Sequence, residues 1–169
     1  MFKIINKPFI KLIYIFYKKR NYLYNLIPYK QYKYIFLDKS RRALPLIYFA
    51  KEKQIGRKPI ILMPGYICND LTKELELIGA KIIYYVNEVD CDKFHTELNN
   101  IKFDIFLYVN YFGNLSSIKK NVLNIIKKQK AWVIQDSTHS TYIDQKDNKS
   151  DFILYSPYKI FGTLNGGLV

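Results

Sequence analysis

From about residue 40 onwards, short apolar runs alternate with longer segments in which apolar residues recur every three or four positions. The short runs are rich in β-branched and aromatic residues, which is typical of buried strands, and the longer segments have the spacing of amphipathic helices. The predicted strands are residues 59–63, 81–86, 103–109, 131–135 and 152–155. The predicted helices are residues 40–54, 69–78, 90–100 and 116–130.

Residues that commonly begin or end helices set these helix boundaries. The expected N-terminal caps are Ser40 for the first helix, Asn69 or Asp70 for the second, Asp90 for the third, and Ser116 or Ser117 for the fourth. Gly56 and Gly79 are expected to end the first two helices, since glycine adopts the left-handed conformation that follows many helices.

The order of elements predicts an α/β fold, with a mostly parallel sheet covered by helices on both faces. Parallel sheets bind their ligands beyond the carboxyl ends of the strands. Functional residues are therefore expected in the loops that follow the strands, at residues 64–69, 110–115, 136–140 and 156–167.

The charge of the chain is concentrated at one end. Residues 1–60 hold 15 of the 27 Lys and Arg residues but only two of the 14 Asp and Glu residues, so the net charge of +13 belongs to this part. An anionic partner such as nucleic acid or a membrane surface is one interpretation. The other is compositional, because Lys, Ile, Asn, Tyr and Phe are over-used together, as an AT-rich coding sequence would dictate, and this second interpretation is preferred. No nucleic-acid partner is expected.

Two further classes of protein are disfavoured. The apolar stretch of residues 8–17 contains Lys11 and has about half of the roughly 20 residues that a membrane-spanning helix needs. Cys68 and Cys91 lack the spacing of a metal-binding pair, and two histidines add too little for a metal cluster. A reduced, cytoplasmic setting fits this cysteine usage, and peripheral contact of residues 1–39 with a membrane is a less favoured alternative.

Two constellations could carry chemistry. Asp136 directly follows a predicted strand, which would place a carboxylate at the carboxyl edge of the sheet, and His139 lies three residues further on. A strand-end aspartate is commonly just a loop or cap residue. Lys159 follows the last predicted strand, near the paired glycines Gly166 and Gly167. A lysine that is desolvated in such a place has a lowered pKa and suits Schiff-base formation.

Six short motifs in this order resemble the DegT/DnrJ/StrS-type aminotransferases, which use pyridoxal 5'-phosphate (PLP) to aminate keto-sugars attached to nucleotides. The motifs are residues 40–44, 64–68, 79–82, 110–113, 135–139, and 150–167 with Ser156 and Lys159. The resemblance covers roughly residues 40–169. It implies part of the large domain of PLP enzymes of fold type I, preceded by a basic, aromatic-rich segment, residues 1–39, of unknown role.

The resemblance also implies a role for each matching residue. Lys159 would bind PLP covalently and then carry the proton between substrate and cofactor carbons. Asp136 would pair with the pyridinium nitrogen and His139 would lie beside the ring. The remaining assignments are Ser156 and Ser40 for the phosphate, and Tyr66 or Cys68 for the face of the ring. Arg41 departs from the small residue that is common in the family's phosphate loop, and its side chain could instead supply charge to the phosphate.

The resemblance further implies an amino-acid donor, glutamate or glutamine, a nucleotide-sugar acceptor and a homodimer when the chain is full length. The chain ends at Val169, just after the glycine pair, so residues 40–169 are expected to be an incomplete PLP-binding domain. Two alternatives stay open: an inactive, truncated fragment of this fold, and a non-catalytic basic module that binds an anionic partner.

Overall fold

The structure is a computed structural model that describes residue 33 and residues 35–86, 92–113, 118–140, 149–161 and 166–169. Its centre is a five-stranded sheet in which every pairing is parallel and the strand order is β3-β2-β4-β5-β6. The strands are β2 (Ile60–Pro64), β3 (Lys81–Tyr85), β4 (Ile105–Val109), β5 (Trp132–Asp136) and β6 (Phe152–Leu154). All five predicted strands are confirmed, with shifts of one or two residues at their ends.

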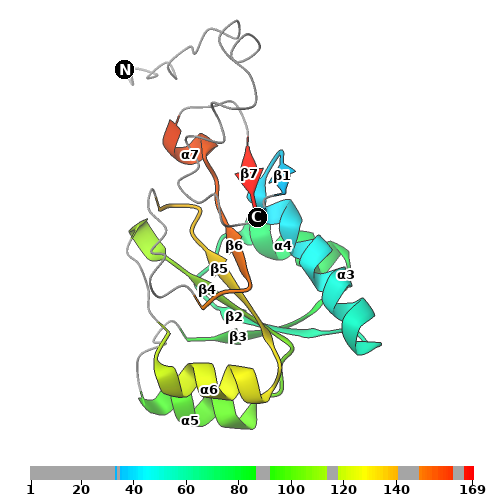
Figure 1. Ribbon diagram of the computed structural model, residues 1–169, viewed down its shortest axis with the longest axis vertical. Coiled ribbons are helices and arrows are strands. Elements are labelled where there is room, and N and C mark those ends of the chain that lie inside the picture. The colour runs from blue at the N-terminus through cyan, green and yellow to red at the C-terminus, as the bar shows by residue number, and fades with distance from the viewer. Residues whose placement is uncertain (1–32, 34, 87–91, 114–117, 141–148, 162–165) are drawn as a thin grey trace, which may run out of the picture.

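Helices cover both faces of the sheet, as predicted (Figure 1). The helical elements are η1 (Ser40–Arg42), α3 (Ala43–Ile55), α4 (Asn69–Leu77), α5 (Asp92–Asn100), η2 (Tyr111–Gly113), α6 (Lys120–Lys128) and α7 (Tyr158–Phe161). In Figure 1, α3 and α4 lie on one side of the sheet, and α5 and α6 lie on the other.

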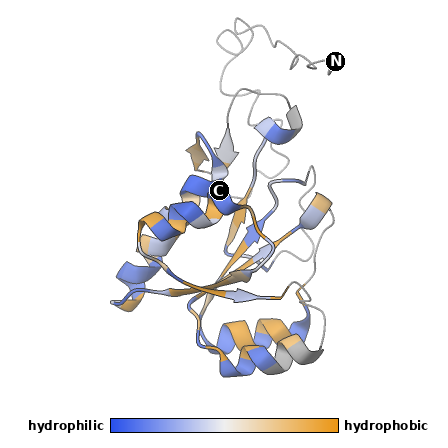
Figure 2. Ribbon diagram, turned by 180° about the vertical axis from the view of Figure 1, so that it is seen from behind, coloured by the Kyte–Doolittle hydropathy of each residue, from blue (hydrophilic) through white to orange (hydrophobic). Residues whose placement is uncertain are grey.

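Each face of the sheet has its own hydrophobic core. Alternate residues of β2 point to opposite faces, so Ile61 and Met63 pack with α3 and α4, whereas Leu62 packs with α5 and α6. Leu44 of α3 and Val122 of α6 are almost completely buried in the two cores. Figure 2 shows the same division by hydropathy, with the apolar side of α6 turned towards the sheet and its polar side turned away.

The helix ends differ from the predicted ones at three N-termini. Lys39, Cys68 and Lys119 stand at the N-cap positions of η1, α4 and α6, and none of them donates or accepts a side-chain capping bond. The predictions that Ser40 caps the first helix and that Asn69 or Asp70 caps the second are therefore wrong. Ser116 and Ser117 lie outside the described residues, but α6 begins too late for either to cap it.

The two predicted glycine stops are confirmed. Gly56 has a φ of 72° at the end of α3, and Gly79 has a φ of 66° just after α4. The predicted cap Asp90 lies outside the described residues, which include α5 from Asp92 onwards.

A two-residue ribbon that the sequence pattern did not predict joins the two ends of the described chain. Strand β1 (Phe36–Leu37) pairs antiparallel with β7 (Gly167–Leu168), and Leu168 also bridges to Tyr155 beyond the end of β6. The last residues of the basic N-terminal segment are thus hydrogen-bonded to the part of the chain that carries the sheet. Among the described residues, no helix combines the length and apolar character needed to cross a membrane.

Candidate functional site

The residues predicted to carry chemistry converge on the carboxyl edge of the sheet. Asp136 is the last residue of β5, and the loop after it supplies Thr138 and His139. The loop after the neighbouring β6 supplies Ser156 and leads into α7, which contains Lys159. Because β5 and β6 are parallel neighbours, these two loops start side by side (Figure 1).

Lys159 reaches across to the loop that follows β5. Its Nζ lies 3.1 Å from Nε2 of His139 and 3.4 Å from Oγ1 of Thr138, and its side chain is exposed. The structure therefore places the predicted amine beside the predicted histidine. Thr138, which sequence reasoning did not single out, completes the contact.

Asp136 supplies a buried carboxylate next to this amine. It is only 5% exposed, and its Oδ1 accepts a 3.0 Å hydrogen bond from the backbone N–H of Thr138. Burial raises the pKa of Asp136, although hydrogen bonds from the Thr138 backbone and side chain and the nearby Lys159 and His139 oppose this rise. A carboxylate in this environment favours a cationic hydrogen-bond donor as its partner.

A buried polar network lies next to Asp136 at the ends of β4 and β5. Asn110 Nδ2 and Gln135 Nε2 both donate to Oγ of Ser137, each at 2.9 Å, and the hydroxyl of Tyr108 donates to Oε1 of Gln135 at 2.7 Å. All four side chains are at least 94% buried. Sequence reasoning missed this network, and the signal it left was a polar residue, Gln135, inside an otherwise apolar strand.

Two buried hydroxyl groups meet at the start of η1. The Oγ atoms of Ser40 and Ser156 are 2.6 Å apart, although 116 residues separate them in sequence. Gly167 packs against this point so closely that an added Cβ would lie 2.1 Å from the backbone nitrogen of Ser40. The ribbon of β1 and β7 thus fixes the backbone where the two predicted phosphate-binding serines meet.

These groups have the chemistry that a PLP site needs. They comprise an amine that can bond to an aldehyde, a buried carboxylate that suits a protonated ring nitrogen, and a hydroxyl pair at a helical start that suits a phosphate. Among the described residues, no group of three or more His, Cys, Asp or Glu side chains could hold a metal ion.

Solved structures with a similar fold include a protein from Streptococcus pneumoniae described as a sugar aminotransferase in its PLP form, with a TM-score of 0.66 and 18% identity. That match covers 86% of this chain and 43% of the other. PseC of Helicobacter pylori, an aminotransferase involved in the biosynthesis of pseudoaminic acid, matches with a TM-score of 0.61, 17% identity and coverage of 81% and 39%.

The likeness extends beyond aminotransferases. An apo cysteine desulfurase from Thermococcus onnurineus matches with a TM-score of 0.59 and 17% identity, over 88% of this chain and 40% of its own.

The chain has the fold of PLP enzymes of fold type I.

It spans about two fifths of the length of these type I enzymes. No protein-family model matches the chain, and no curated protein matches it. The fold-class prediction is therefore confirmed, whereas the narrower resemblance to the DegT/DnrJ/StrS-type family stays a prediction.

Arg41 does not join the serine pair in this type I fold. Its Nη1 lies 2.8 Å from Oδ2 of Asp70 and its Nε lies 3.3 Å from Oε1 of Glu74, so its charge is directed to carboxylates of α4. These ion pairs tie η1 to α4. The prediction that Arg41 supplies charge to a phosphate has no support in this geometry.

Tyr66 and Cys68, the two candidates for the face of the cofactor ring, differ in their surroundings. Tyr66 is 66% exposed, and its ring centroid lies 5.6 Å from that of Tyr111, whose hydroxyl donates to the carbonyl of Tyr66. Burial, with Asp136 and Tyr66 nearby, raises the pKa of Tyr111 to about 12. Cys68 is exposed and precedes α4. Tyr66 thus has an aromatic neighbour, Tyr111, whose hydroxyl lies in the electrostatic field of Asp136.

Proposed function

We propose that this chain is the cofactor-binding part of a PLP-dependent aminotransferase, with Lys159 as the residue that holds the cofactor. The observation that carries the proposal is the contact of Lys159 Nζ with His139 and Thr138, together with the hydrogen bond from the Thr138 N–H to the buried carboxylate of Asp136. Both groups stand at the carboxyl edge of a parallel sheet, where α/β proteins bind their ligands.

Each residue has a role that follows from its position. Bound PLP supplies an electron sink for the carbanion that forms when a substrate loses a proton. Lys159 holds the cofactor and, once released from it, moves that proton as a general base and acid. Asp136 holds the proton on the ring nitrogen, and its burial strengthens this charge interaction because water is excluded.

The phosphate of the cofactor is proposed to bind at the paired hydroxyl groups of Ser40 and Ser156. Both side chains are buried, and they already share a hydrogen bond that a phosphate oxygen could replace with two. His139 is proposed to orient the ring, because its Nε2 lies within hydrogen-bond distance of the amine that holds it.

The proposed substrate class is a keto-sugar linked to a nucleotide, with glutamate or glutamine as the amino donor. This finer assignment is supported by the order of the six motifs and by two neighbours described as a sugar aminotransferase and as an aminotransferase in pseudoaminic acid biosynthesis. A homodimer is proposed for the complete enzyme. The competing candidate is an inactive fragment of this fold, which would hold the cofactor without converting an amino donor.

The half-reaction with the amino donor tests the proposed activity. The PLP-loaded chain is mixed with glutamate or glutamine, and the absorbance of the cofactor and the release of the 2-oxo acid are followed together. The account predicts one equivalent of 2-oxo acid per cofactor, and regeneration of the original absorbance by a nucleotide-linked keto-sugar. Bound cofactor that no donor converts would favour the inactive fragment.

Two variants serve as controls for this half-reaction. Lys159→Ala removes the amine, so it should give no 2-oxo acid. Lys120→Ala removes an exposed lysine at the start of α6 and should behave as the wild type does. Equal loss in both variants would point to a general effect of lysine charge and against the proposed role of Lys159.

A further inference from the structure

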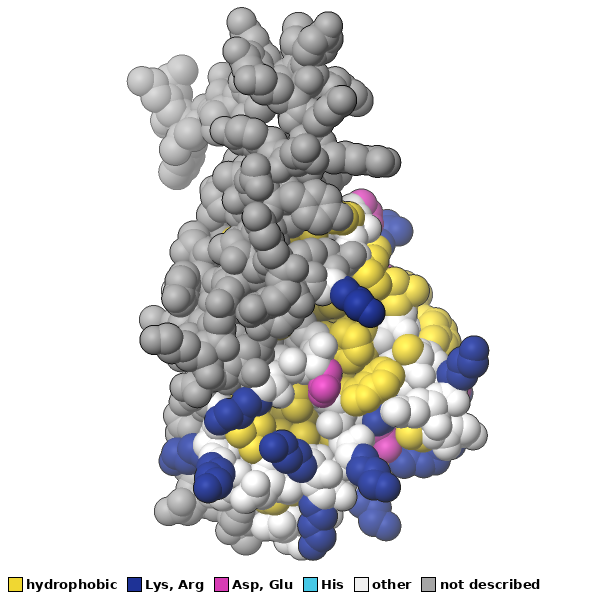
Figure 3. Space-filling model, in the orientation of Figure 1, with side chains coloured by type: hydrophobic (Ala, Val, Ile, Leu, Met, Phe, Trp, Pro, Cys, Tyr) yellow, Lys and Arg dark blue, Asp and Glu magenta, His cyan; other side chains and the backbone are white. Residues whose placement is uncertain are grey.

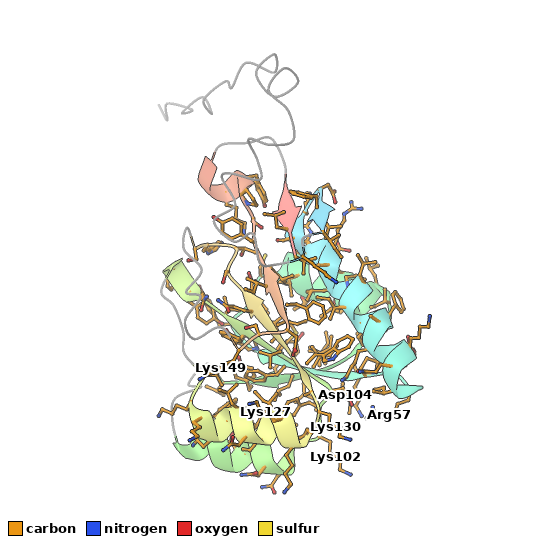
Figure 4. The ribbon with its side chains drawn as sticks, in the orientation of Figure 1. Arg57, Lys102, Asp104, Lys127, Lys130 and Lys149 are labelled. Carbon is orange, nitrogen blue, oxygen red and sulfur yellow. The ribbon has the colours of Figure 1, made fainter. Side chains whose placement is uncertain are left out.

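The opposite edge of the sheet, where the strands begin, carries a regular set of exposed lysines. Each of the five parallel strands starts at or just after one of them, and together they are called the lysine row. The lysine row consists of Lys58 before β2, Lys81 at the start of β3, Lys102 before β4, Lys130 before β5 and Lys149 before β6. Figure 4 labels three of them, and Figure 3 shows Lys and Arg side chains gathered over the lower part of the visible face with few acidic ones between.

The two carboxylates in the loops that precede the strands, Asp104 and Asp151, are already engaged by other groups. Asp104 accepts hydrogen bonds of 2.8 and 2.7 Å from Arg57 and one of 2.8 Å from the backbone N–H of Ile60. Asp151 accepts a 2.8 Å hydrogen bond from the backbone N–H of Val133. Among the residues that the structure describes, no lysine of the row forms a salt bridge. The positive charge of the lysine row therefore faces solvent.

Helix dipoles account for only part of this charge. The C-terminal ends of helices favour cations, which explains Lys127 and Lys128 in the last turn of α6. Lys58, Lys102 and Lys149 lie outside helices, and α5 has no basic residue in its last turn. The lysine row thus exceeds what the helix ends require.

The sheet arranges these lysines in a line. The strand order puts them in the sequence Lys81, Lys58, Lys102, Lys130, Lys149 along the edge, although the chain visits them in a different order. Neighbouring strands are about 4.8 Å apart, so five strands spread the lysine row over roughly 19 Å, along the twist of the sheet. A line of cations on this scale matches a linear polyanion, in which charges also follow one another at short, regular intervals.

The side chains between the lysines indicate which kind of polyanion could bind. None of the large exposed hydrophobic residues that the structure describes lies in the loops 56–59, 79–80, 101–104, 129–131 or 149–151. Binding to single-stranded nucleic acid usually adds exposed aromatic side chains that stack on bases, and stable membrane binding adds apolar groups that insert. A duplex needs neither, because its phosphates lie on the outside.

We propose that the lysine row binds the phosphate backbone of double-stranded nucleic acid without reading its sequence. The amino-acid composition alone did not predict such a partner, because an excess of lysine in a sequence does not mean that the lysines lie together in the fold. The row lies at the other end of the strands from Lys159 and Asp136, so a duplex bound there leaves the candidate cofactor site open. The proposal is independent of the aminotransferase function.

The test compares two triple variants of the full chain that lose the same charge, one at the edge where the strands begin and one away from it. The edge variant is Lys58→Gln, Lys102→Gln and Lys149→Gln, and the control variant is Lys73→Gln in the middle of α4 with Lys119→Gln and Lys120→Gln at the start of α6. Binding to a short labelled DNA duplex of arbitrary sequence is measured by fluorescence anisotropy over a series of salt concentrations. Because residues 1–60 hold most of the excess positive charge, the matched comparison cancels their contribution.

The proposal predicts weaker binding by the edge variant and a salt dependence less steep than that of the wild type by about 2.7 in the slope of log affinity against log salt, since each lost phosphate contact removes about 0.9. The control variant should keep the wild-type slope, and an edge variant with Arg at the three positions should restore it. If the triple Gln variant does not fold, as judged by circular dichroism, Lys149→Gln alone should lower the slope by about 0.9.

Three outcomes would overturn the proposal. The two triple variants could lose affinity equally, which would mean that only net charge matters. Neither could lose affinity, which would place the binding elsewhere. The edge variant could lose binding to vesicles rich in anionic phospholipid while keeping its binding to the duplex, which would make the lysine row a membrane contact.

Discussion

The two edges of the same sheet present opposite chemistry. At the carboxyl edge, polar groups such as Asp136, Ser137 and Ser156 are buried and hydrogen-bonded to one another or to backbone. At the amino edge, the lysine row is exposed, and the loop carboxylates Asp104 and Asp151 are engaged by Arg57 and backbone N–H groups. In this fold, the buried polar groups of the carboxyl edge could hold a ligand in a fixed position, and the exposed lysines of the amino edge could make a diffuse, electrostatic contact.

Two aspartates, one at each edge, differ in the direction in which the fold shifts their pKa. Burial raises the pKa of Asp136 at the carboxyl edge. For Asp104 at the amino edge, burial also acts to raise the pKa, but the bonds from Arg57 and the Ile60 N–H outweigh it and lower the pKa. The charge of Asp136 therefore lowers the stability of the folded chain, whereas the charge of Asp104 raises it.

The largest effect is expected from Gly167→Ala at the carboxyl edge. The new Cβ would lie 2.1 Å from the backbone nitrogen of Ser40, and the nearest atoms belong to backbone that cannot rotate away. We expect a loss of about 3 kcal/mol in the free energy of unfolding, measured by urea denaturation. Gly65→Ala is the control, because its Cβ would lie 3.5 Å from the nearest atom, the oxygen of Tyr85, and an effect as large there would contradict the tight packing at Ser40.

The next effect has the opposite sign. Asp136→Asn should stabilise the cofactor-free chain at neutral pH by about 0.5 to 2 kcal/mol, because it removes a buried charge, while it abolishes the proposed role on the ring nitrogen. The raised pKa fixes the pH dependence: the charge penalty grows as pH rises from the unfolded pKa, about 3.9, to the higher folded pKa. The free energy of unfolding is measured at a pH below the unfolded pKa and at neutral pH. Asp136→Asn should be more stable than the wild type only at neutral pH, and a lower stability there would contradict the account.

Asp104→Asn should destabilise the chain by about 1 kcal/mol at neutral pH, a modest value because its partner Arg57 is largely exposed to solvent. The stabilisation is fully present above the unfolded pKa of about 3.9 and is lost as pH falls through the lower folded pKa. Acid unfolding of the wild type and the variant should therefore converge below that window. Convergence at a pH well above the unfolded value would show that Arg57 does not hold the carboxylate as described.

The smallest effect is expected from Thr138→Val, about 0.5 kcal/mol in stability. Its useful readout is the pKa of Asp136, which the hydrogen bonds from Thr138 act to lower. Loss of the hydroxyl should raise that pKa further, as followed by carbon-detected NMR of the carboxyl group. Thr138→Ser keeps the hydroxyl and should leave the titration in place. An identical titration in all three proteins would exclude the Thr138 hydroxyl as a partner of the carboxylate.

The sequence predicted the elements that have a period and missed those that depend on contacts across the fold. The five strands and the helices on both faces follow from runs of apolar residues such as Ile105–Val109. The ribbon of β1 and β7 was missed because two residues cannot show a period. Ser40 was assigned to a helix cap because serine caps helices, whereas its hydroxyl bonds to Ser156, 116 residues away.

At the two edges of the sheet, too, the sequence did not predict contacts between residues that are far apart in the chain. The convergence of Asp136, His139 and Lys159 could be predicted because each follows a predicted strand closely, but the contact of Thr138 with Lys159 was seen only in the structure. The ion pairs of Arg41 could not be predicted, since its partners Asp70 and Glu74 lie about 30 residues away. The lysine row has no signature in the sequence, because only the strand order brings its members into line.

Borohydride reduction of the chain after incubation with PLP tests the central claim most directly. Reduction fixes the cofactor to the lysine that holds it, and peptide mass spectrometry then identifies that residue. The account predicts label on Lys159, its loss in Lys159→Ala, and its retention in the control Lys120→Ala. A folded chain that takes up no label, or that labels many lysines to the same extent, would contradict the assignment of the carboxyl edge as a PLP site.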